Sequence, residues 1–386
     1  MTSLRLITML IIAGCMAVSS TALHANENVT ANDSITRRPG LIRRIFNYFD
    51  RSNQDRPDKK FDVTFLGGPS YSDATSFYLA VMAAGVYHTR RDSVTPTSEA
   101  SVFAQASFTG FYRIGLSGNH YSPGDKFRIV YDIDFAHFPL KFWGIGYADE
   151  HIKTNETKYT ELQSDFQADF TWRLPHDVFI GPTVNFHFSD ATKVTRPELW
   201  HGQSLKVFNY GMGLVVSYDS RDYVTNASRG WNVRLEQKFF PRFFGNRYAF
   251  SSTELTLGWY KQFWKSGIWA FQAHGWSTYG NTPWCMMPTL DSSKAIRGYF
   301  EGRYRNKNEA DIVVELRQHV WKRTGIVVWG GVGTVFNHPK EINIHTLLPS
   351  YGIGVRWELK KKVNLRVDFG VGKHSTGFML GMHETF

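Results

Sequence analysis

The sequence predicts an all-β chain, a transmembrane antiparallel β-barrel of about sixteen strands with a short N-terminal periplasmic helix. Three observations support this fold class. The chain begins with an apolar targeting segment, apolar and polar residues alternate repeatedly from residue 75 onward, and the last alternating segment, residues 377–386, ends in Phe386. A terminal aromatic strand behind a secretory signal is typical of bacterial outer-membrane barrels, so we expect the bacterial outer membrane as the location.

Residues 1–25 are predicted to be a signal peptide, which plays no part in the fold. Arg5 is their only charged residue, an apolar region follows, and the tripeptide ending in Ala25 fits a signal-peptidase site. A second interpretation is that the segment from Ile12 to Cys15 is a lipobox, which would make Cys15 a lipidated N-terminus. No later window offers the roughly 20 apolar residues that a membrane helix needs.

Residues 26–74 are predicted to be a polar, basic segment in the periplasm. A helix from Gly40 to about Arg51 would place its apolar residues on one side: Leu41, Ile42, Ile45, Phe46 and Phe49. Two interpretations remain open for this amphipathic helix. It lies at the inner-leaflet interface or under the barrel mouth, or it is a fraying helix within a linker.

Residues 75–386 are predicted to form the barrel. The clearest strand ends at Leu174 and alternates apolar residues with charged or polar ones from Asp165 onward. In a barrel one face of each strand meets lipid and the other faces a polar lumen. Both termini are expected in the periplasm, which requires an even number of strands. The predicted strands are 75–88, 98–108, 110–121, 126–137, 142–149, 159–174, 177–188, 207–219, 229–240, 250–264, 267–279, 308–321, 324–336, 350–359, 362–372 and 376–386.

The composition argues against cofactor chemistry. Cys15 and Cys285 are the only cysteines, so no disulfide framework and no cysteine-based metal site is expected. The fourteen histidines are dispersed, and neither a metalloprotease motif nor a nucleophile elbow occurs. Acids such as Asp165, Asp169 and Asp368 are more simply explained as polar lumen wall than as a catalytic pair. The chain is therefore not expected to be an enzyme or to hold a cofactor or metal.

The formal net charge of +10 has several possible meanings. Basic chains can bind nucleic acid, but here the lysines and arginines are scattered among the predicted strands and loops. Most of them are expected on solvated polar surface. The remainder fit anionic lipid better than nucleic acid, so outer-membrane lipid is the predicted partner and nucleic acid is not.

One long predicted loop resembles a known family signature. Residues 293–305, Ser-Lys-Ala-Ile-Arg-Gly-Tyr-Phe-Glu-Gly-Arg-Tyr-Arg, are similar to the sixth outer loop of the bacterial surface-antigen barrels, a family that includes the barrels of BamA and TamA. Further similar segments occur in the same order as in the family and extend the resemblance to about residues 67–386: Phe142 to Tyr147, Tyr218 to Asp222, Glu315 to Arg317, Leu365 to Gly370 and the terminal Phe386.

The resemblance implies that residues 280–307 fold back into the lumen. Their tip, Arg297, Gly298 and Tyr299, would dock on the inner wall, with Arg297 paired to Glu315. A guanidinium inside a barrel needs an acceptor, because an unpaired buried charge is costly. The alternative is that Arg297 is an exposed cation of the loop.

A second acid of the family pattern is missing from this sequence. The family has it on the strand after Glu315, where this chain has Gly331. Glu301 or Asp368 could substitute for it, and the sequence leaves that choice open.

The resemblance also implies a function in outer-membrane protein assembly or translocation, acting through a lateral seam between the first and last strands. The assembly machinery is an expected partner through the C-terminal strand, with Phe386 as the assembly signal. The segment before the barrel is too short for the periplasmic POTRA domains of such assembly factors. The alternative function is a plugged channel, or a structural scaffold for a periplasmic or lipoprotein partner.

The seam is predicted to join residues 377–386 to about residues 75–88. Gly377 and Gly381 in the final strand leave few side chains to pack. The predicted mate has a run of small residues that ends at Gly85, so few bulky cross-strand pairs would stabilise the junction. We expect this seam to be the weakest ladder of the barrel.

Overall fold

The computed structural model describes residues 61–72, 76–90, 95–224, 226–290, 295–360, 363–382 and 384–386. The chain divides into two units, Met1–Tyr48 and Phe49–Phe386, and every described residue belongs to the second. The predicted signal peptide and the predicted helix from Gly40 to Arg51 lie outside the described residues.

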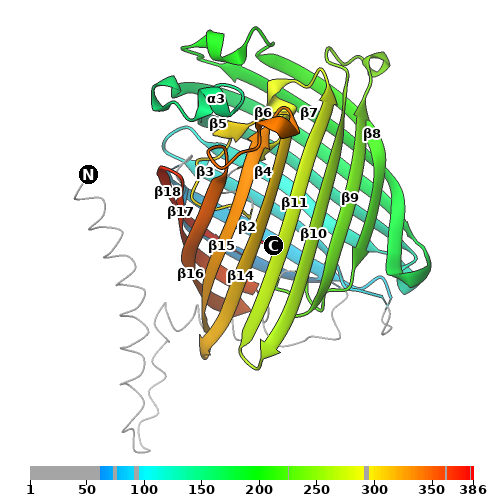
Figure 1. The fold of residues 1–386 in the computed structure, drawn as a ribbon. Coiled ribbons are helices and arrows are strands. Elements are labelled where there is room, and N and C mark those ends of the chain that lie inside the picture. The colour runs from blue at the N-terminus through cyan, green and yellow to red at the C-terminus, as the bar shows by residue number, and fades with distance from the viewer. Residues whose placement is uncertain are drawn as a thin grey trace, which may run out of the picture. The chain divides into compact units, whose positions relative to one another are not determined.

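A single antiparallel sheet of sixteen strands curls into the barrel of this second unit (Figure 1). Each strand pairs with the next one along the chain, and β11 pairs with β14 across a long connection. No helix within the described ranges is long and apolar enough to cross a membrane. The strands of the sheet are β1 (Phe61–Ser72), β2 (Ser76–Tyr87), β3 (Ser98–Ser107), β4 (Tyr112–Tyr121), β5 (Phe127–Phe142), β6 (Thr157–Arg173), β7 (Val178–Thr192), β8 (Lys206–Asp219), β9 (Gly230–Phe240), β10 (Phe250–Trp264), β11 (Gly267–Gly280), β14 (Asn308–Trp321), β15 (Thr324–Phe336), β16 (Leu348–Lys360), β17 (Val363–Gly372) and β18 (Ser375–Met382).

The strands have an exposed apolar face and a buried polar face. In β8, Phe208, Tyr210 and Met212 are exposed, whereas Val207, Asn209 and Gly211, which alternate with them, are buried. Successive side chains of a strand point to opposite sides of the sheet. An apolar exterior around an interior of charged and polar residues is the arrangement of a membrane barrel. The predicted all-β fold is therefore confirmed.

The predicted number of sixteen strands is right, but only because two errors cancel: one strand was not predicted, and one predicted strand does not exist. Residues 61–72, assigned to the N-terminal segment, form β1 and pair along their whole length with β2, so the barrel begins at Phe61 and not at residue 75. Gly67, Gly68 and Pro69 interrupt the alternation of β1, which hid this strand from the sequence pattern.

The predicted strand 142–149 does not exist. β5 continues to Phe142, and a loop with the short helix α3 (Tyr147–Glu150) follows. Gly144 and Gly146 have φ values of +109° and +90°, a backbone conformation that glycine adopts freely and that the interior of a regular strand does not contain. A Cβ at Gly144 would also lie 2.7 Å from Cβ of Asp149, so this glycine allows the chain to turn away from the sheet.

Adding β1 and removing the false strand reverses the side on which the turns between β2 and β5 lie. Residues 122–126 therefore join the other short turns at the end opposite the long connections. The described parts of the long connections gather at one end of the barrel (Figure 1): 143–156, 193–205, 281–290 with 295–307, and 337–347. Outer-membrane barrels have this asymmetry, with short periplasmic turns and longer extracellular loops.

The predicted seam is also corrected. The last strand of the sheet, β18, ends at Met382 and not at Phe386, and its spatial neighbour at the other edge is β1 instead of β2. The rings of Tyr71 and Phe378 lie 6.0 Å apart across this junction. Among the described residues, no backbone pairing joins β1 to β18.

The exposed face of β8 provides a test of membrane embedding. Met212→Lys places a charge near the middle of the strand and should lower the free energy of unfolding in lipid vesicles by roughly 2–4 kcal/mol. Phe208→Lys, near the end of the same strand, is the matched control and should cost only about 0–1 kcal/mol. Urea titrations of both variants measure the difference, and equal costs would show that this face does not meet hydrocarbon.

Candidate functional site

The described parts of the long connection from β11 to β14, residues 281–290 and 295–307, fold against the inner wall of the barrel. Two short strands within it, β12 (Thr289–Leu290) and β13 (Tyr304–Arg305), pair with each other. Apolar residues of the connection and of β14, β15 and β16 form one buried cluster: Leu290, Ala295, Ile296, Tyr299, Tyr304, Val313, Val327, Trp329, Val335 and Leu348. Burial of this apolar surface holds the connection inside the lumen.

Gly298 and Tyr299 bring the backbone of the connection directly onto β17. Gly298 has φ +101°, and a Cβ there would lie 2.9 Å from the backbone nitrogen of Gly372. A Cβ at Gly370 would in turn lie 2.8 Å from the nitrogen of Gly298, so two glycines permit this approach. The Tyr299 hydroxyl donates to the carbonyl of Pro349 at 2.5 Å and accepts from the amide of Lys373 at 2.8 Å.

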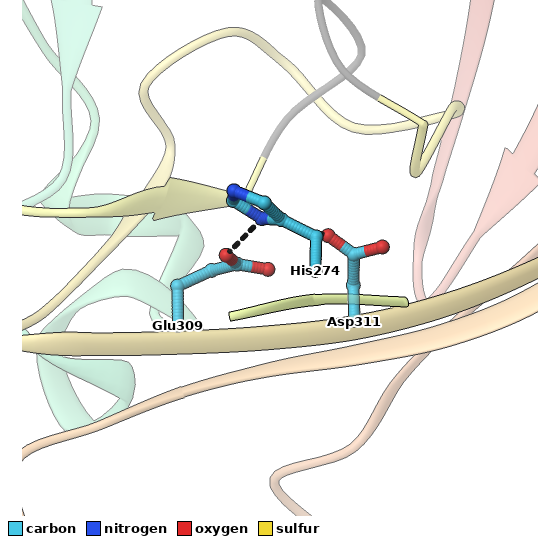
Figure 2. A group of neighbouring side chains, drawn as sticks. All are labelled: His274, Glu309 and Asp311. Atoms are coloured by element: carbon cyan, nitrogen blue, oxygen red, sulfur yellow. Dashed lines mark ion pairs between the residues drawn. The ribbon is translucent and has the colours of Figure 1, made fainter. Parts of the chain in front are cut away.

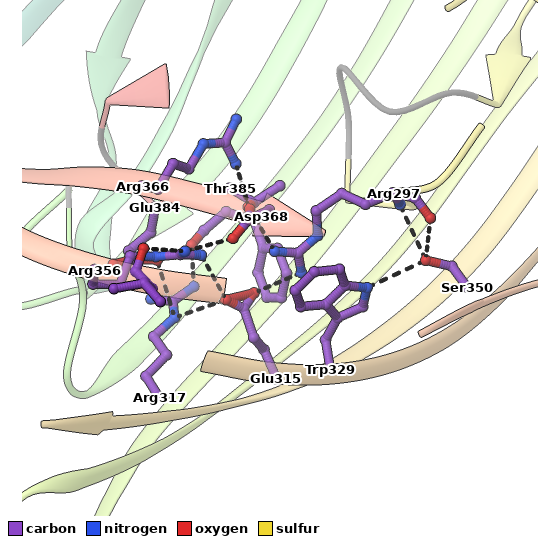
Figure 3. Close-up of polar contacts among 12 residues, drawn as sticks. Arg297, Glu315, Arg317, Trp329, Ser350, Arg356, Arg366, Asp368, Glu384 and Thr385 are labelled. Carbon is purple, nitrogen blue, oxygen red and sulfur yellow. Dashed lines mark hydrogen bonds and ion pairs between the residues drawn. The ribbon is translucent and has the colours of Figure 1, made fainter. Parts of the chain in front are cut away.

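The guanidinium of Arg297 is only 1% exposed and lies between two carboxylates (Figure 3). Its Nη2 is 3.2 Å from Oε2 of Glu315 on β14, and its Nη1 is 3.0 Å from Oδ2 of Asp368 on β17. Its Cζ stands 3.5 Å from the centroid of the Trp329 ring on β15. The sequence alternative of an exposed Arg297 is therefore wrong, and Asp368 supplies the second acid.

The structure also gives a reason why Gly331 replaces the family's second acid. A Cβ at this position would lie 2.7 Å from the carbonyl oxygen of Ile312 and 2.8 Å from Cγ2 of Val313. No side chain fits there without displacing β14. The neighbouring indole of Trp329 fills the space beside the guanidinium instead, and its Nε1 donates to Oγ of Ser350 at 3.3 Å.

Three further arginines extend the contacts of Arg297 with Glu315 and Asp368 into a network that we call the arginine cluster. Its members are Arg297, Arg317, Arg356, Arg366, Glu315, Asp368 and Glu384 (Figure 3). Arg356 links the carboxylates, with Nη1 2.5 Å from Asp368 and Nε 2.8 Å from Glu384. Four guanidinium groups face three carboxylates, so the cluster has a formal charge of +1 in a buried setting, where each pair depends strongly on its neighbours.

The last described residues, 384–386, turn into the lumen and join this cluster. Arg366 donates from Nη1 to Oγ1 of Thr385, and Arg317 donates from Nη2 to the carbonyl of Phe386 at 2.7 Å. The predicted continuation of the strand to Phe386 is wrong for a reason that the sequence contained. Glu384 has the same parity as Phe378, so a continuous strand would place its carboxylate in lipid. The role of Phe386 as an assembly signal stays a prediction.

The loop after β5 contacts residues 303–305 of this connection. The carboxyl of Glu150 in α3 accepts a 2.6 Å hydrogen bond from the amide of Arg305, and the Arg303 Nε donates to the Glu150 carbonyl at 3.4 Å. Burial raises the pKa of Glu150 well above its ordinary value, and the Arg305 amide opposes that rise only in part. The buried carboxyl of Glu150 therefore holds the two loops together, in a setting that favours its neutral form.

Sequence comparison identifies the family. The profile of the Omp85 superfamily domain matches residues 86–386, which is most of the chain. The chain belongs to the Omp85 superfamily. It is accordingly a barrel of the bacterial outer membrane, and its family members serve in outer-membrane assembly or translocation. Among curated proteins, none matches the chain by sequence.

Solved structures agree with the Omp85 assignment at the level of the fold. BamA from Haemophilus ducreyi lacking POTRA domains 1–3 is similar with a TM-score of 0.56 and 10% identity, over 86% of this chain and 71% of BamA. CdiB from Escherichia coli gives 0.56 at 8% identity over 85% of this chain, and CdiB from Acinetobacter baumannii gives 0.54 at 10% over 84%. The matches cover 63% and 60% of the two CdiB chains, so this chain spans about three fifths of CdiB.

Removing the Arg297 side chain tests its role in docking the connection. Arg297→Ala leaves Glu315 and Asp368 buried without this cation and should destabilise the docked state by up to roughly 3–5 kcal/mol. Arg297→Lys keeps the charge but loses the two-pronged contact and the stacking on Trp329, so an intermediate loss is expected. Protease sensitivity of residues 281–307 and urea unfolding measure both.

The control for this prediction is Arg196→Ala. Arg196 pairs with Glu198 in an outer loop, where both side chains are well exposed. Exposed pairs contribute about 0–1 kcal/mol, so little change is expected. Equal protease resistance of Arg297→Ala and the unmodified chain would exclude the docking role.

Glu150 predicts a pH dependence of loop packing. Because burial favours the protonated carboxyl in the docked state, docking is strongest below the ordinary carboxyl pKa of 4.5 and weakens as pH rises through the raised pKa. Hydrogen exchange of residues 147–155, corrected for its intrinsic pH dependence, should therefore accelerate as pH rises above 4.5. Glu150→Gln keeps an acceptor for Arg305 and should remove this dependence; an unchanged dependence in that variant would locate the titrating group elsewhere.

Proposed function

We propose that this Omp85 barrel helps another polypeptide to insert into or cross the outer membrane by opening its sheet between β1 and β18. The observation that carries the proposal is the junction itself. Every other pair of neighbouring strands is joined by a backbone hydrogen-bonded ladder, whereas none is present between β1 and β18 among the described residues. A sheet separates most easily where fewest backbone hydrogen bonds must break.

The course of the last residues supports the same mechanism. β18 has eight residues and β1 has twelve, so β18 is the shorter edge. Because residues 384–386 turn inward to the arginine cluster, they do not extend this edge. A strand edge with unpaired backbone groups is a template for adding a strand from another chain.

The docked connection argues against a wide central pore. Leu290 and residues 295–305 pack on β14 to β17 inside the lumen, and the loop containing α3 packs on them. This plugging also favours the second candidate function, a closed channel or a structural scaffold for a periplasmic or lipoprotein partner. Under either function we propose lipid as a partner, together with the assembly machinery that would recognise the C-terminal strand.

Cross-linking the junction distinguishes the two candidates. Tyr71→Cys with Phe378→Cys, in a Cys285→Ser background, should form a disulfide across the seam because the two native rings are adjacent. The oxidised barrel in liposomes should then lose the ability to accelerate insertion of a urea-denatured eight-stranded barrel, and reduction should restore it. Heat-modifiable gel migration verifies that the barrel remains folded.

A second cross-link is the matched control. Phe188 and Phe208 lie directly opposite each other on β7 and β8, with ring centroids 4.5 Å apart. A disulfide between cysteines at these positions locks an ordinary ladder and should leave activity unchanged. Full activity of the seam-locked barrel would exclude lateral opening, and single-channel conductance of the Arg297→Ala variant would then test the plugged-channel function.

A further inference from the structure

A second cluster of charged side chains lies on the inner wall, away from the arginine cluster. His274 on β11 and Glu309 and Asp311 on β14 are all buried and point toward one another (Figure 2). Nδ1 of His274 is 2.9 Å from Oε2 of Glu309 and 3.4 Å from Oδ2 of Asp311. The strand register explains the convergence, because His274 stands directly opposite Asp311 and two positions from the partner of Glu309.

The opposite nitrogen of the same imidazole is held by a fourth residue. Nε2 of His274 lies 3.0 Å from Oε1 of Glu254 on β10, in hydrogen-bonding geometry. Donation to a carboxylate places a proton on Nε2 and directs the Nδ1 position toward Glu309 and Asp311. A histidine that binds a metal commonly donates its second ring nitrogen to a carboxylate in this way, which fixes the ring and its tautomer.

Two atoms indicate that a ligand belongs between these side chains. Nδ1 of His274 makes no hydrogen bond within the described part of the chain, despite its short distances to the two carboxylates. Oδ1 of Asp311, a residue that is 4% exposed, likewise has no hydrogen-bond partner among the described residues. Buried polar atoms are almost always paired, so the Asp311 oxygen beside the imidazole indicates that a ligand can bind between these two side chains.

We propose that His274, Glu309 and Asp311 bind a divalent transition-metal ion, with Glu254 orienting the imidazole. The ligand atoms lie within 4.8 Å of one another, and ligand distances of about 2.0–2.2 Å bring such atoms around one ion with small side-chain movements. One imidazole and two carboxylates suit Zn²⁺ or a neighbouring first-row metal, whereas Ca²⁺ and Mg²⁺ prefer oxygen ligands alone.

Charge and position give the ion a structural role. One imidazole faces three carboxylates in this cluster, which leaves a net negative charge that a divalent cation balances. The ion would tie β11 to β14 directly under the docked connection, since Gly333, the strand partner of Asp311, is covered by Leu290. The sequence predicted no metal site because these residues form no motif along the chain, and only strand pairing brings them together.

Zinc binding by the folded chain tests the proposal. Untagged full-length protein is refolded in detergent, treated with a chelator and titrated with Zn²⁺ in a calorimeter. About one ion per chain should bind. His274→Gln and Asp311→Asn should each weaken binding at least about tenfold, and Glu254→Gln should weaken it about 10–100-fold.

His187→Gln is the matched control for these variants. His187 is another buried lumenal histidine, with Nδ1 2.5 Å from a single carboxylate, Asp165. This variant should bind Zn²⁺ as the unmodified chain does, and heat-modifiable migration confirms folding of all variants.

X-ray absorption of the zinc-loaded, unmodified chain provides a measurement that needs no variant. It should show one imidazole and oxygen ligands. A sulfur ligand would assign the ion to Cys285. Saturable binding that Asp311→Asn leaves unchanged would place the ion elsewhere in the chain. Absence of saturable binding would show that a protonated imidazole alone bridges the carboxylates. Each of these results overturns the metal site and leaves the seam proposal untouched.

Discussion

The burial of one guanidinium determines how the interior of this barrel is organised. Arg297 is removed from water by its own connection, and an isolated buried charge of this kind would cost far more than the connection gains by packing. Two carboxylates and an aromatic face compensate it, and they come from β14, β17 and β15. The connection can therefore occupy only the position where these three strands present their side chains together.

The same need to compensate buried charge links the docked connection to the junction between β1 and β18. The wall supplies two acids, Glu315 and Asp368, to four arginines, which leaves an excess of positive charge in a poorly solvated space. Glu384 reduces that excess, and it reaches Arg356 because the chain leaves β18 and turns inward. The packing of the connection and the course of the last residues thus depend on one network. A change in either is therefore expected to affect the exposed edge of β18.

The sequence predicted the parts of the fold that depend on alternation and the parts of the site that depend on the family signature. Strand β6 can be predicted from the alternation in its sequence, because every second residue faces lipid. Strand β1 cannot, because Gly67, Gly68 and Pro69 interrupt the alternation, while backbone pairing to β2 still holds the strand. The partnership of Asp368 with Arg297 depends on distances between strands far apart in sequence, which no local pattern contains.

A last constraint concerns β14, which carries both charged clusters on one face. Its inward side chains are, at period two, Glu309, Asp311, Val313, Glu315 and Arg317. Val313 separates the acidic pair from the arginine cluster, and Ile296 and Tyr299 of the connection belong to the same buried apolar cluster. This apolar layer keeps the Arg297 guanidinium with Glu315 and Asp368, although more negative charge lies farther along the same strand, at Asp311 and Glu309. Two factors thus position the signature loop. Hydrophobic packing limits which carboxylates Arg297 can meet, and Arg297 neutralises the charge of the two that it does meet, Glu315 and Asp368.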